Sequence, residues 1–560
     1  MAGHPLETVT ISGLMAPASR GESIMRPAID RRAFLTATAA GLILPVRPAL
    51  ARLWPISGFT HGVASGHPGP GAVTLWTRYA SVTGAATVLK LEVAEDQGMS
   101  RIIARAEAVA GAETWGTAQA RVTGLPEGKW LWYRFTAPDG TMSMVGRTKT
   151  LPTGKLDQLK LAVVSCSNRP FGHFNAYAHA AVRDDIDAVL HLGDYIYEYQ
   201  MGSYPEQVMP GREILPVDEI LMIDDYRQRY ASYRTDPGLQ AIHARFPMIA
   251  IWDDHEFAND TWKGGAQNHQ ADEGVWNLRR DAALKAHREW LMSPEVPWHR
   301  YDFGDLVSVM TLDTRMSGRD KQLDLNAALR GGPDGIKAFA SGEWQNPART
   351  LLGMEQEAWF ASEIASAVKS GQRWQLIAQQ VVMGDIMTPK NALDFLAPGA
   401  DARAQGYVKG GIAAAQAGIP GAQDMWSGYP QARRRLLKAM ADAGADPIVI
   451  AGDSHNAWAF NHTLDGKPVA AEFGVHSVTS PGYESALAAD PALIRAALLQ
   501  SSPGMQWCDT SRRGYLTLSF NATETRCDWV FMDTIKTVSM ATSAPQAAVV
   551  KRGKRKMTLA

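Results

Sequence analysis

Cysteine is scarce in this chain, and long apolar runs and internal repeats are absent from its sequence. The 560 residues include only three cysteines, an odd number, which excludes a dense disulfide framework. The formal net charge is −1, so no overall field attracts nucleic acid or anionic lipid. The chain has no apolar run long enough to span a bilayer and no internal repeat. With 46% hydrophobic and 20% charged residues, the composition is typical of a globular protein with two or more domains, without nucleic-acid binding as its main role.

The N-terminal segment resembles a twin-arginine export signal. Asp30-Arg-Arg-Ala-Phe-Leu-Thr36 is followed by an apolar run and then by Ala49-Leu-Ala51, which has the small residues of a cleavage site. Residues 1–51 are interpreted as an N-terminal extension and signal peptide, with the start at Met1 or Met25. The resemblance implies a periplasmic or extracellular protein that the twin-arginine machinery exports already folded.

Residues 55–150 have the alternating pattern of short strands. The segments 88–94, 118–122 and 130–136 alternate apolar and polar residues and are separated by turns rich in Gly and Pro. This pattern predicts a small β-sandwich. Leu151-Pro-Thr-Gly-Lys155 follows it as a linker.

From residue 155 to 535 the pattern becomes that of an α/β domain. Buried strands alternate with helical stretches, and we predict strands over 161–165, 188–192, 248–252, 306–312, 374–378 and 447–451. The segments 323–349 and 394–427 are irregular and rich in Gly, Ala and Asn, so we expect loop excursions that shape access to a site. Residues 536–560, with their basic run, are expected to form a solvated C-terminal tail.

Two of the cysteines lie near the end of this domain. Cys508 and Cys527 flank or lie within a possible hairpin of two strands, 515–520 and 525–531. A disulfide between them and two buried free thiols are equally compatible with the sequence. Cys166 then remains as the cysteine that needs another explanation.

Polar and ionisable residues follow five of the six predicted strands. Because the ends of neighbouring strands meet at one edge of a sheet, residues far apart in the sequence can form one site there. Asp194 is the clearest of them, since Gly193 allows a sharp turn directly after a buried strand. The groups are Ser165-Cys166-Ser167-Asn168, Gly193-Asp194-Tyr195-Ile196-Tyr197, Trp252-Asp253-Asp254-His255-Glu256, Gln379-Gln380 and Gly452-Asp453-Ser454-His455-Asn456.

This order of motifs resembles the calcineurin-like metallophosphoesterases, and more closely the alkaline phosphatase D (PhoD) family. The resemblance extends over almost the whole chain after the signal, including Phe59 to Arg78, Leu312-Asp-Thr-Arg315 and Leu352-Gly-Met-Glu-Gln356 with Trp359. It implies a layered α/β/β/α catalytic domain preceded by the β-sandwich. It also implies a phosphoric ester hydrolase.

The family resemblance assigns metal ligands to the strand-end residues. Asp194 is expected to bridge two cations, with Cys166, Tyr197 and His455 completing one site. The second site would use Asp254 and Asp453, with Gln380 or Asn168 as a further ligand. A thiolate and a phenolate suit an oxidised transition metal, and the resemblance names Fe³⁺. The second, all-oxygen set suits Ca²⁺, in a dinuclear or larger centre.

Three further groups of residues have less certain roles. His255 follows the ligand Asp254, and we expect it to lie over the substrate, although a structural role is the alternative. Arg315 is expected to contact a phosphate oxygen, with an ion pair to Asp313 or another neighbour equally compatible. Asp253 and Glu256 are weaker candidates that we expect to support the ligands, and Asn259 is compatible with a substrate or metal contact or with a loop cap.

The sequence therefore predicts an exported phosphoesterase in which a metal-held hydroxide attacks phosphomonoesters, phosphodiesters or both. One alternative is a diesterase of phospholipase D type that acts on lipid head groups or cell-wall polymers. Another is a surface binding protein that metals merely stabilise. The predicted catalytic residues are His255, Asp194 and Arg315. The sequence indicates neither the physiological substrate nor the oligomeric state.

Overall fold

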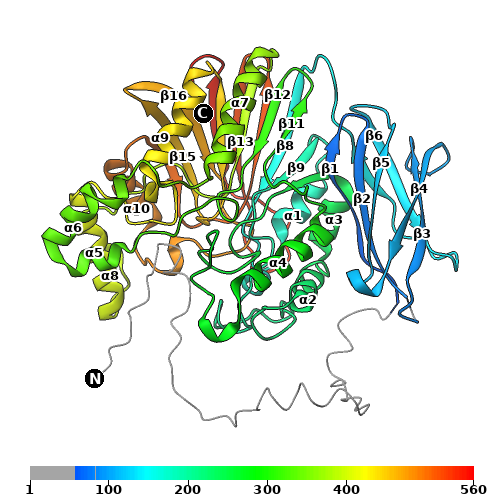
Figure 1. Cartoon of the computed structure of the whole chain (residues 1–560), viewed down its shortest axis with the longest axis horizontal. Helices are drawn as coiled ribbons and strands as arrows, with labels where there is room; N and C mark the ends of the chain where they lie inside the picture. Colours follow the sequence, from blue (N-terminus) through cyan, green and yellow to red (C-terminus); the bar gives the residue numbers. More distant parts are fainter. Residues whose placement is uncertain (1–56, 82) are drawn as a thin grey trace, which may run out of the picture.

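The fold is built from two large β-sheets packed face to face and one smaller sheet (Figure 1). The computed structural model describes residues 57–81 and 83–560, so the predicted export signal lies outside the described residues. The first sheet has ten strands in the order β21-β20-β19-β18-β8-β9-β10-β1-β2-β5. The second has seven, in the order β11-β12-β13-β14-β16-β15-β17, and the third has four, in the order β4-β3-β6-β7.

The six predicted strands of the α/β domain lie at the centres of the two large sheets. The structure places them as Gln158–Val164 (β8), Ala188–His191 (β9), Pro247–Ala250 (β10), Val307–Thr311 (β12), Trp374–Ala378 (β13) and Pro447–Ala451 (β14). Strands β8, β9 and β10 pair in parallel in the first sheet, and β12, β13 and β14 pair in parallel in the second. Their carboxyl ends therefore meet at one edge of each sheet.

Other strands extend both sheets on either side of these centres. In the second sheet they are His299–Phe303 (β11), Ala457–Leu464 (β15), Lys467–Gly474 (β16) and Met505–Asp509 (β17). In the first sheet the predicted hairpin forms as Gly514–Asn521 (β18) and Glu524–Phe531 (β19).

Helices cover the outer faces of both sheets. The inner faces share an apolar core that includes Leu190, Val309 and Leu516. One outer core lies beneath Asn175–Ala181 (α1), Ile223–Tyr233 (α2), Pro237–Arg245 (α3) and Trp276–Leu291 (α4). The other lies beneath Met354–Lys369 (α7), Pro430–Asp442 (α9) and Pro491–Ser501 (α10). This α/β/β/α layering confirms the predicted fold class.

The N-terminal strands continue the first sheet. Gly58–Gly69 (β1), Ala72–Ala80 (β2) and Thr117–Thr123 (β5) belong to it, because β1 pairs in parallel with β10 through Ser65 and Pro247. The third sheet packs against them and consists of Thr87–Ala94 (β3), Ile102–Ala110 (β4), Trp130–Thr136 (β6) and Gly146–Lys149 (β7). The region 55–150 thus contains two facing layers, one of which is continuous with the catalytic domain.

The C-terminal residues differ from the expected tail. Gln546–Lys551 (β20) and Met557–Leu559 (β21) add two strands to the edge of the first sheet. Ala548, Val550 and Met557 are buried there, and only the basic residues between the strands form an exposed turn. The apolar alternation before the basic run is sufficient for a strand.

Three helices form where we expected loops. They are Leu325–Arg330 (α5), Gly332–Ser341 (α6) and Ala402–Gln416 (α8), at the end of the molecule opposite the third sheet (Figure 1). The Asp324 and Asp401 side chains accept hydrogen bonds from the amides of Ala327 and Ala404, as N-caps do. These caps and the helix propensity of alanine outweigh the cost of the glycines in these segments.

Two remaining expectations concern the cysteines and the membrane. Cys508 lies in β17 and Cys527 in β19, on different sheets, and both are buried free thiols. The sequence left open a disulfide or two buried free thiols, and the structure contains two buried free thiols. Among residues 57–81 and 83–560, no helix has the length and apolar character needed to cross a membrane.

Candidate metal centre

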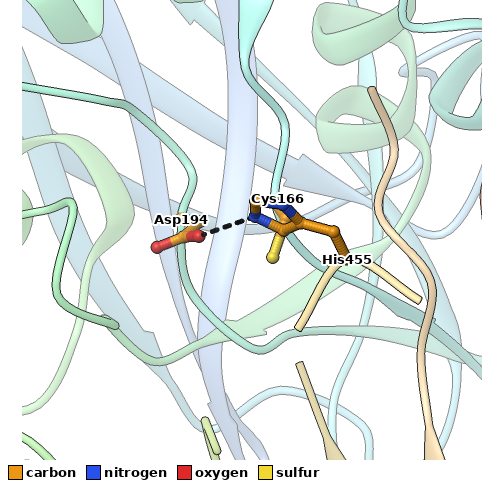
Figure 2. Close-up of side chains that lie close together, drawn as sticks. All are labelled: Cys166, Asp194 and His455. Atoms are coloured by element: carbon orange, nitrogen blue, oxygen red, sulfur yellow. Dashed lines mark ion pairs between the residues drawn. The ribbon is translucent and has the colours of Figure 1, made fainter. Parts of the chain in front are cut away.

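Side chains from both large sheets converge at the strand ends. Cys166 follows β8, Asp194 follows β9, and Asp254 follows β10, while Asp453 and His455 follow β14 of the other sheet. Figure 2 shows Cys166, Asp194 and His455 close together, with Asp194 and His455 paired at 3.8 Å. The site therefore lies where the two sheets face each other, and it depends on their relative position.

Four of these residues have a left-handed backbone. The φ angles are 57° at Cys166, 55° at Asp194, 61° at Asp453 and 62° at His455. Non-glycine residues seldom adopt this region, and such strain is concentrated at functional sites. The sharp turns direct the side chains back across the strand ends instead of along the sheet.

The two glycines before the aspartates allow the loops to approach closely. A Cβ at Gly193, whose φ is 100°, would lie 2.4 Å from the Cβ of Asp253. A Cβ at Gly452 would lie 2.3 Å from the hydroxyl oxygen of Ser165. Only glycine fits at either position, because larger residues would push the ligand loops apart.

The converging side chains form three overlapping groups of donor atoms. Within each group, the donor atoms lie within 4.8 Å of one another. The groups are Cys166, Asp194 and His455; Asp194, Asp254 and His255; and Asp253, Asp254 and Asp453. Asp194 and Asp254 each belong to two groups, as expected for carboxylates placed between neighbouring cations.

Asp194 is a buried carboxylate shared by two of these groups. It is 1% exposed, and its Oδ2 accepts a hydrogen bond of 2.9 Å from the Tyr197 hydroxyl. Its Oδ1 is buried and has no hydrogen-bond partner among the described residues. A buried carboxylate oxygen without a partner is costly, so this donor set fits a cation.

His455 is oriented so that one ring nitrogen faces the site. Its Nδ1 lies 2.9 Å from the Pro481 carbonyl oxygen, which must accept the hydrogen of that nitrogen. The lone pair is then on Nε2, which lies 3.2 Å from the Tyr197 hydroxyl. This is the arrangement by which proteins fix the tautomer of a metal-binding histidine.

Tyr197 and Cys166 are acidic donors held in their neutral forms by their surroundings. Burial, followed by the nearby Asp194 carboxylate, raises the pKa of both groups well above the usual range. The Tyr197 hydroxyl also lies 2.7 Å from the Ser480 hydroxyl. A cation among these atoms would favour phenolate and thiolate, because it stabilises the anionic forms.

The oxygen-rich part of the site carries more negative charge than the protein alone neutralises. Burial and the neighbouring carboxylates of Asp424, Asp254 and Asp194 raise the pKa of Asp453 to about 7, although Arg315 opposes them. Asn168 is fully buried, and its Oδ1 has no partner among the described residues. Both observations fit an oxygen-coordinated cation.

Arg315 holds the carboxylates in place and is fully buried. Its guanidinium donates to Asp253, Asp424 and Asp453, with Nη1 lying 2.6 Å from Asp424. Arg319 donates to the same Asp424. The sequence predicted a phosphate contact or an ion pair, and the structure shows ion pairs, two of them with the donor residues Asp253 and Asp453.

We expect Arg315→Met to destabilise the fold strongly. It leaves three buried carboxylates without their shared partner, which costs about 3–5 kcal/mol in the free energy of unfolding. Arg434, whose side chain is 56% exposed and pairs with Asp465 at 3.0 Å, provides the control. Arg434→Met should cost less than about 1 kcal/mol. Urea denaturation of both variants measures the difference, and equal losses would contradict this role for Arg315.

Gln380 occupies a different position from the one expected. Its Oε1 accepts hydrogen bonds from the Thr314 amide and hydroxyl, at 2.9 and 2.7 Å. Its Nε2 donates to the carbonyl oxygens of Trp252 and Leu312. Both lone pairs of the amide oxygen are used, so Gln380 has none left for a cation and instead ties the two sheets together.

His255 lies against the metal donors and is held by a residue that the sequence did not single out. Its Nδ1 is 2.7 Å from Oε2 of Glu198, and its ring lies 4.2 Å from that of Tyr197. Burial lowers the pKa of His255, but the carboxylates of Asp254, Glu198 and Asp194 outweigh it and raise that pKa well above its usual value. With Nδ1 held by Glu198, Nε2 is the other ring nitrogen of His255.

Glu198 and Glu256 connect the ligand loops. Glu198 is fully buried and also accepts a hydrogen bond of 2.7 Å from the Asn259 backbone amide, while the Asn259 side chain donates to Gln267 at 3.0 Å. Glu256 accepts from the backbone amides of Asp194, Tyr195 and Asp253. Glu198 could have been found in the sequence, because it is an acidic residue directly after the Gly193 to Tyr197 motif.

Comparisons with known proteins agree with this geometry. A family model described as PhoD-like phosphatase matches residues 161–529, and one described as its N-terminal domain matches residues 48–152. Alkaline phosphatase D of Bacillus subtilis (strain 168) is 31% identical over 518 residues, which cover 88% of this chain and 81% of that protein.

Solved structures resemble the fold as well. A structure of PhoD superposes with a TM-score of 0.74 and 27% identity, over 92% of this chain and 93% of the other. A purple acid phosphatase, PPD1 from yellow lupin seeds, superposes with a TM-score of 0.53 and 12% identity, over 88% and 74% of the two chains, and shows the shared fold alone. The family and the metallophosphoesterase-like fold imply metal ions. The chain belongs to the PhoD-like phosphatase family and is a phosphoric ester hydrolase.

Proposed function

We propose that this protein is an exported, metal-dependent phosphoesterase that hydrolyses phosphomonoesters, phosphodiesters or both. The observation that carries the proposal is the position of Asp194. It belongs to two groups of donor atoms and has a buried oxygen without a partner among the described residues. Family membership supports the phosphoesterase activity.

The donor atoms suggest two unlike cations. Cys166, Asp194, Tyr197 and His455 would hold Fe³⁺, because a thiolate and a phenolate suit an oxidised transition metal. Asp254, Asp453 and Asn168 offer only oxygen and would hold Ca²⁺. When bound, such cations stabilise the charge of a phosphoryl transition state and lower the pKa of a water molecule.

The protein's own residues position and protonate the substrate. His255 is held by Glu198 at Nδ1, so its Nε2 is the nitrogen available to give a proton to the leaving oxygen. Arg315 keeps Asp253 and Asp453 at fixed positions. Glu256 fixes the separation of the loops that carry Asp194 and Asp253. Each contact reduces the reorganisation needed during the reaction.

The activity can be tested with two chromogenic esters. Purified protein should hydrolyse 4-nitrophenyl phosphate, bis(4-nitrophenyl) phosphate or both. A rate on the diester far below that on the monoester would count against the diesterase alternative that acts on lipid head groups or wall polymers. If neither ester is hydrolysed by metal-replete protein, the proposed function is wrong.

The assignment of iron predicts a coloured protein. A phenolate bound to Fe³⁺ gives a charge-transfer band in the visible range, so purified protein should absorb there. Tyr197→Phe removes the phenolate while retaining the ring and should abolish the band. Tyr199→Phe, which changes the neighbouring tyrosine of the same segment, should leave it unchanged. A colourless, iron-free and fully active wild type would refute the iron assignment but not the phosphoesterase.

Export rests on the sequence of the N-terminal segment. The Arg31-Arg32 pair and the residues that follow resemble a twin-arginine signal. Replacing both arginines by lysine retains the charge but should leave the protein in the cytoplasm, as cell fractionation would show. Unchanged release of the double variant would contradict this route.

A further inference from the structure

An apolar pocket shares the loop of residues 480–487 with the metal centre and has no role in the proposed chemistry. Its walls come from α8, α10 and the segments 386–395 and 483–487, and enclose about 690 Å³, including the part open to solvent. None of the lining residues is charged. Its buried wall residues include Phe395, Val408, Ile494 and Leu498. Small-molecule sites are typically lined in this way, by mostly apolar side chains with a few polar groups.

One wall of the pocket is continuous with the loop that holds the metal donors. Ser480 contacts the Tyr197 hydroxyl, and the Pro481 carbonyl oxygen lies 2.9 Å from Nδ1 of His455. The pocket residue Tyr483 is two positions further on, so its Cα is at most about 7.6 Å from that of Pro481. Its amide donates to Oδ1 of Asn456, the residue after His455, at 3.1 Å.

The opposite wall of the pocket carries a second tyrosine. Tyr407 of α8 lines the pocket. Burial, followed by the side chains of Tyr483 and Asp260, raises the pKa of Tyr407. The Asp260 amide donates to Oδ2 of Asp254 at 2.7 Å. The pocket is therefore connected to the donor set through the loop that carries Tyr483.

We propose that this pocket binds the hydrocarbon group of the phosphate ester whose phosphoryl group is held at the metal centre. Uncharged, buried walls favour an alkyl group and disfavour a sugar or a charged alcohol, because polar groups would lose water there without gaining partners. The proposal rests on the proposed function for the position of the phosphoryl group. It adds that the substrate alcohol is apolar.

Binding of alkylphosphonates tests the pocket without any hydrolysis, because their carbon–phosphorus bond is not an ester. Calorimetric titration of the metal-replete protein with methyl-, butyl-, hexyl- and octylphosphonate should show affinity rising by up to about four-fold for each buried methylene. Ala486→Trp places an indole in the pocket and should make the affinity independent of chain length. Ala488→Trp, two residues on, exposed and outside the lining, is the matched control and should retain the rise.

A second variant covers the case in which Ala486→Trp does not fold. Val408→Thr retains the shape of the wall but adds a hydroxyl, and should reduce the gain per methylene. Equal affinities across the series in the wild type, or an undiminished rise in the folded pocket variants, would overturn the proposal. Hydrolysis of 4-nitrophenyl phosphate is measured in parallel. Hydrolysis of bis(4-nitrophenyl) phosphate is measured as well, and absence of both activities together with length-dependent binding would reject the proposed function and retain the pocket.

Discussion

Replacement of Asp194 by asparagine should lower phosphoester hydrolysis by at least about 10³-fold, because a cation contributes several kcal/mol to transition-state stabilisation. The amide has the same size but lacks the negative charge, and only one of its two terminal atoms is an acceptor. The unpartnered Oδ1 and the acceptor Oδ2 of Asp194 therefore cannot both be replaced. Steady-state kinetics on 4-nitrophenyl phosphate and elemental analysis of the variant give the result.

Asp465→Asn provides a matched control for this prediction. Asp465 also has a left-handed backbone, with φ 50°, but its side chain is 68% exposed in a turn between β15 and β16. The same substitution in the same backbone conformation should leave both metal content and rate within about two-fold of the wild type. Wild-type activity in Asp194→Asn would show that Asp194 does not bridge cations.

Replacement of His255 by alanine should lower the rate by about 10²–10⁴-fold for an alkyl phosphate, whose leaving oxygen needs a proton. The loss should be much smaller for 4-nitrophenyl phosphate, because nitrophenolate departs without one. The ratio of the two losses separates proton donation from general damage to the site. A purely structural histidine would give equal losses on both esters.

Glu198→Gln tests how His255 is held. Glu198 accepts from His255 and Asn259, and glutamine retains the shape while replacing one acceptor with a donor. We expect a loss of about 10–100-fold, typical of residues that orient a functional histidine. The loss should again be larger on the alkyl ester than on the nitrophenyl ester. The control is His462→Gln, because His462 pairs with another buried carboxylate, Glu472, at 2.9 Å. We expect this variant to leave the ratio of the rates on the two esters unchanged.

The central strands could be predicted because their environment is uniform. Strands such as Trp374–Ala378 and Pro447–Ala451 are buried on both faces and therefore appear as continuous apolar runs. The polar residues after each run then indicate the functional edge. Asp194 and His455 could be predicted as neighbours for this reason, although 261 positions separate them in the chain.

The partners of the site could not be predicted in the same way. Arg315 contacts Asp253, Asp424 and Asp453, which come from separate loops of both sheets. Such contacts depend on how the sheets face each other, and no local pattern encodes that distance. The expected role of Gln380 as a ligand was wrong for a related reason. Its position at a strand end does not reveal that its side-chain amide is already hydrogen-bonded to Thr314 and Trp252.

The helices at 323–349 and 394–427 were missed because their sequences give conflicting signals. Glycines within α6 and α8 indicated loops, whereas Asp324 and Asp401 begin helices as side-chain caps. The expected function of the second segment, to shape access to the site, is retained in the proposed pocket through Tyr407 and Val408. The pocket itself is assembled from four segments and has no sequence signature.

The most direct test of the central claim is metal analysis of the active protein together with its activity after metal removal. We predict that purified, active protein contains iron and calcium, that chelation abolishes hydrolysis of 4-nitrophenyl phosphate, and that returning both metals restores it. Protein that retains full activity with neither metal present would contradict the account.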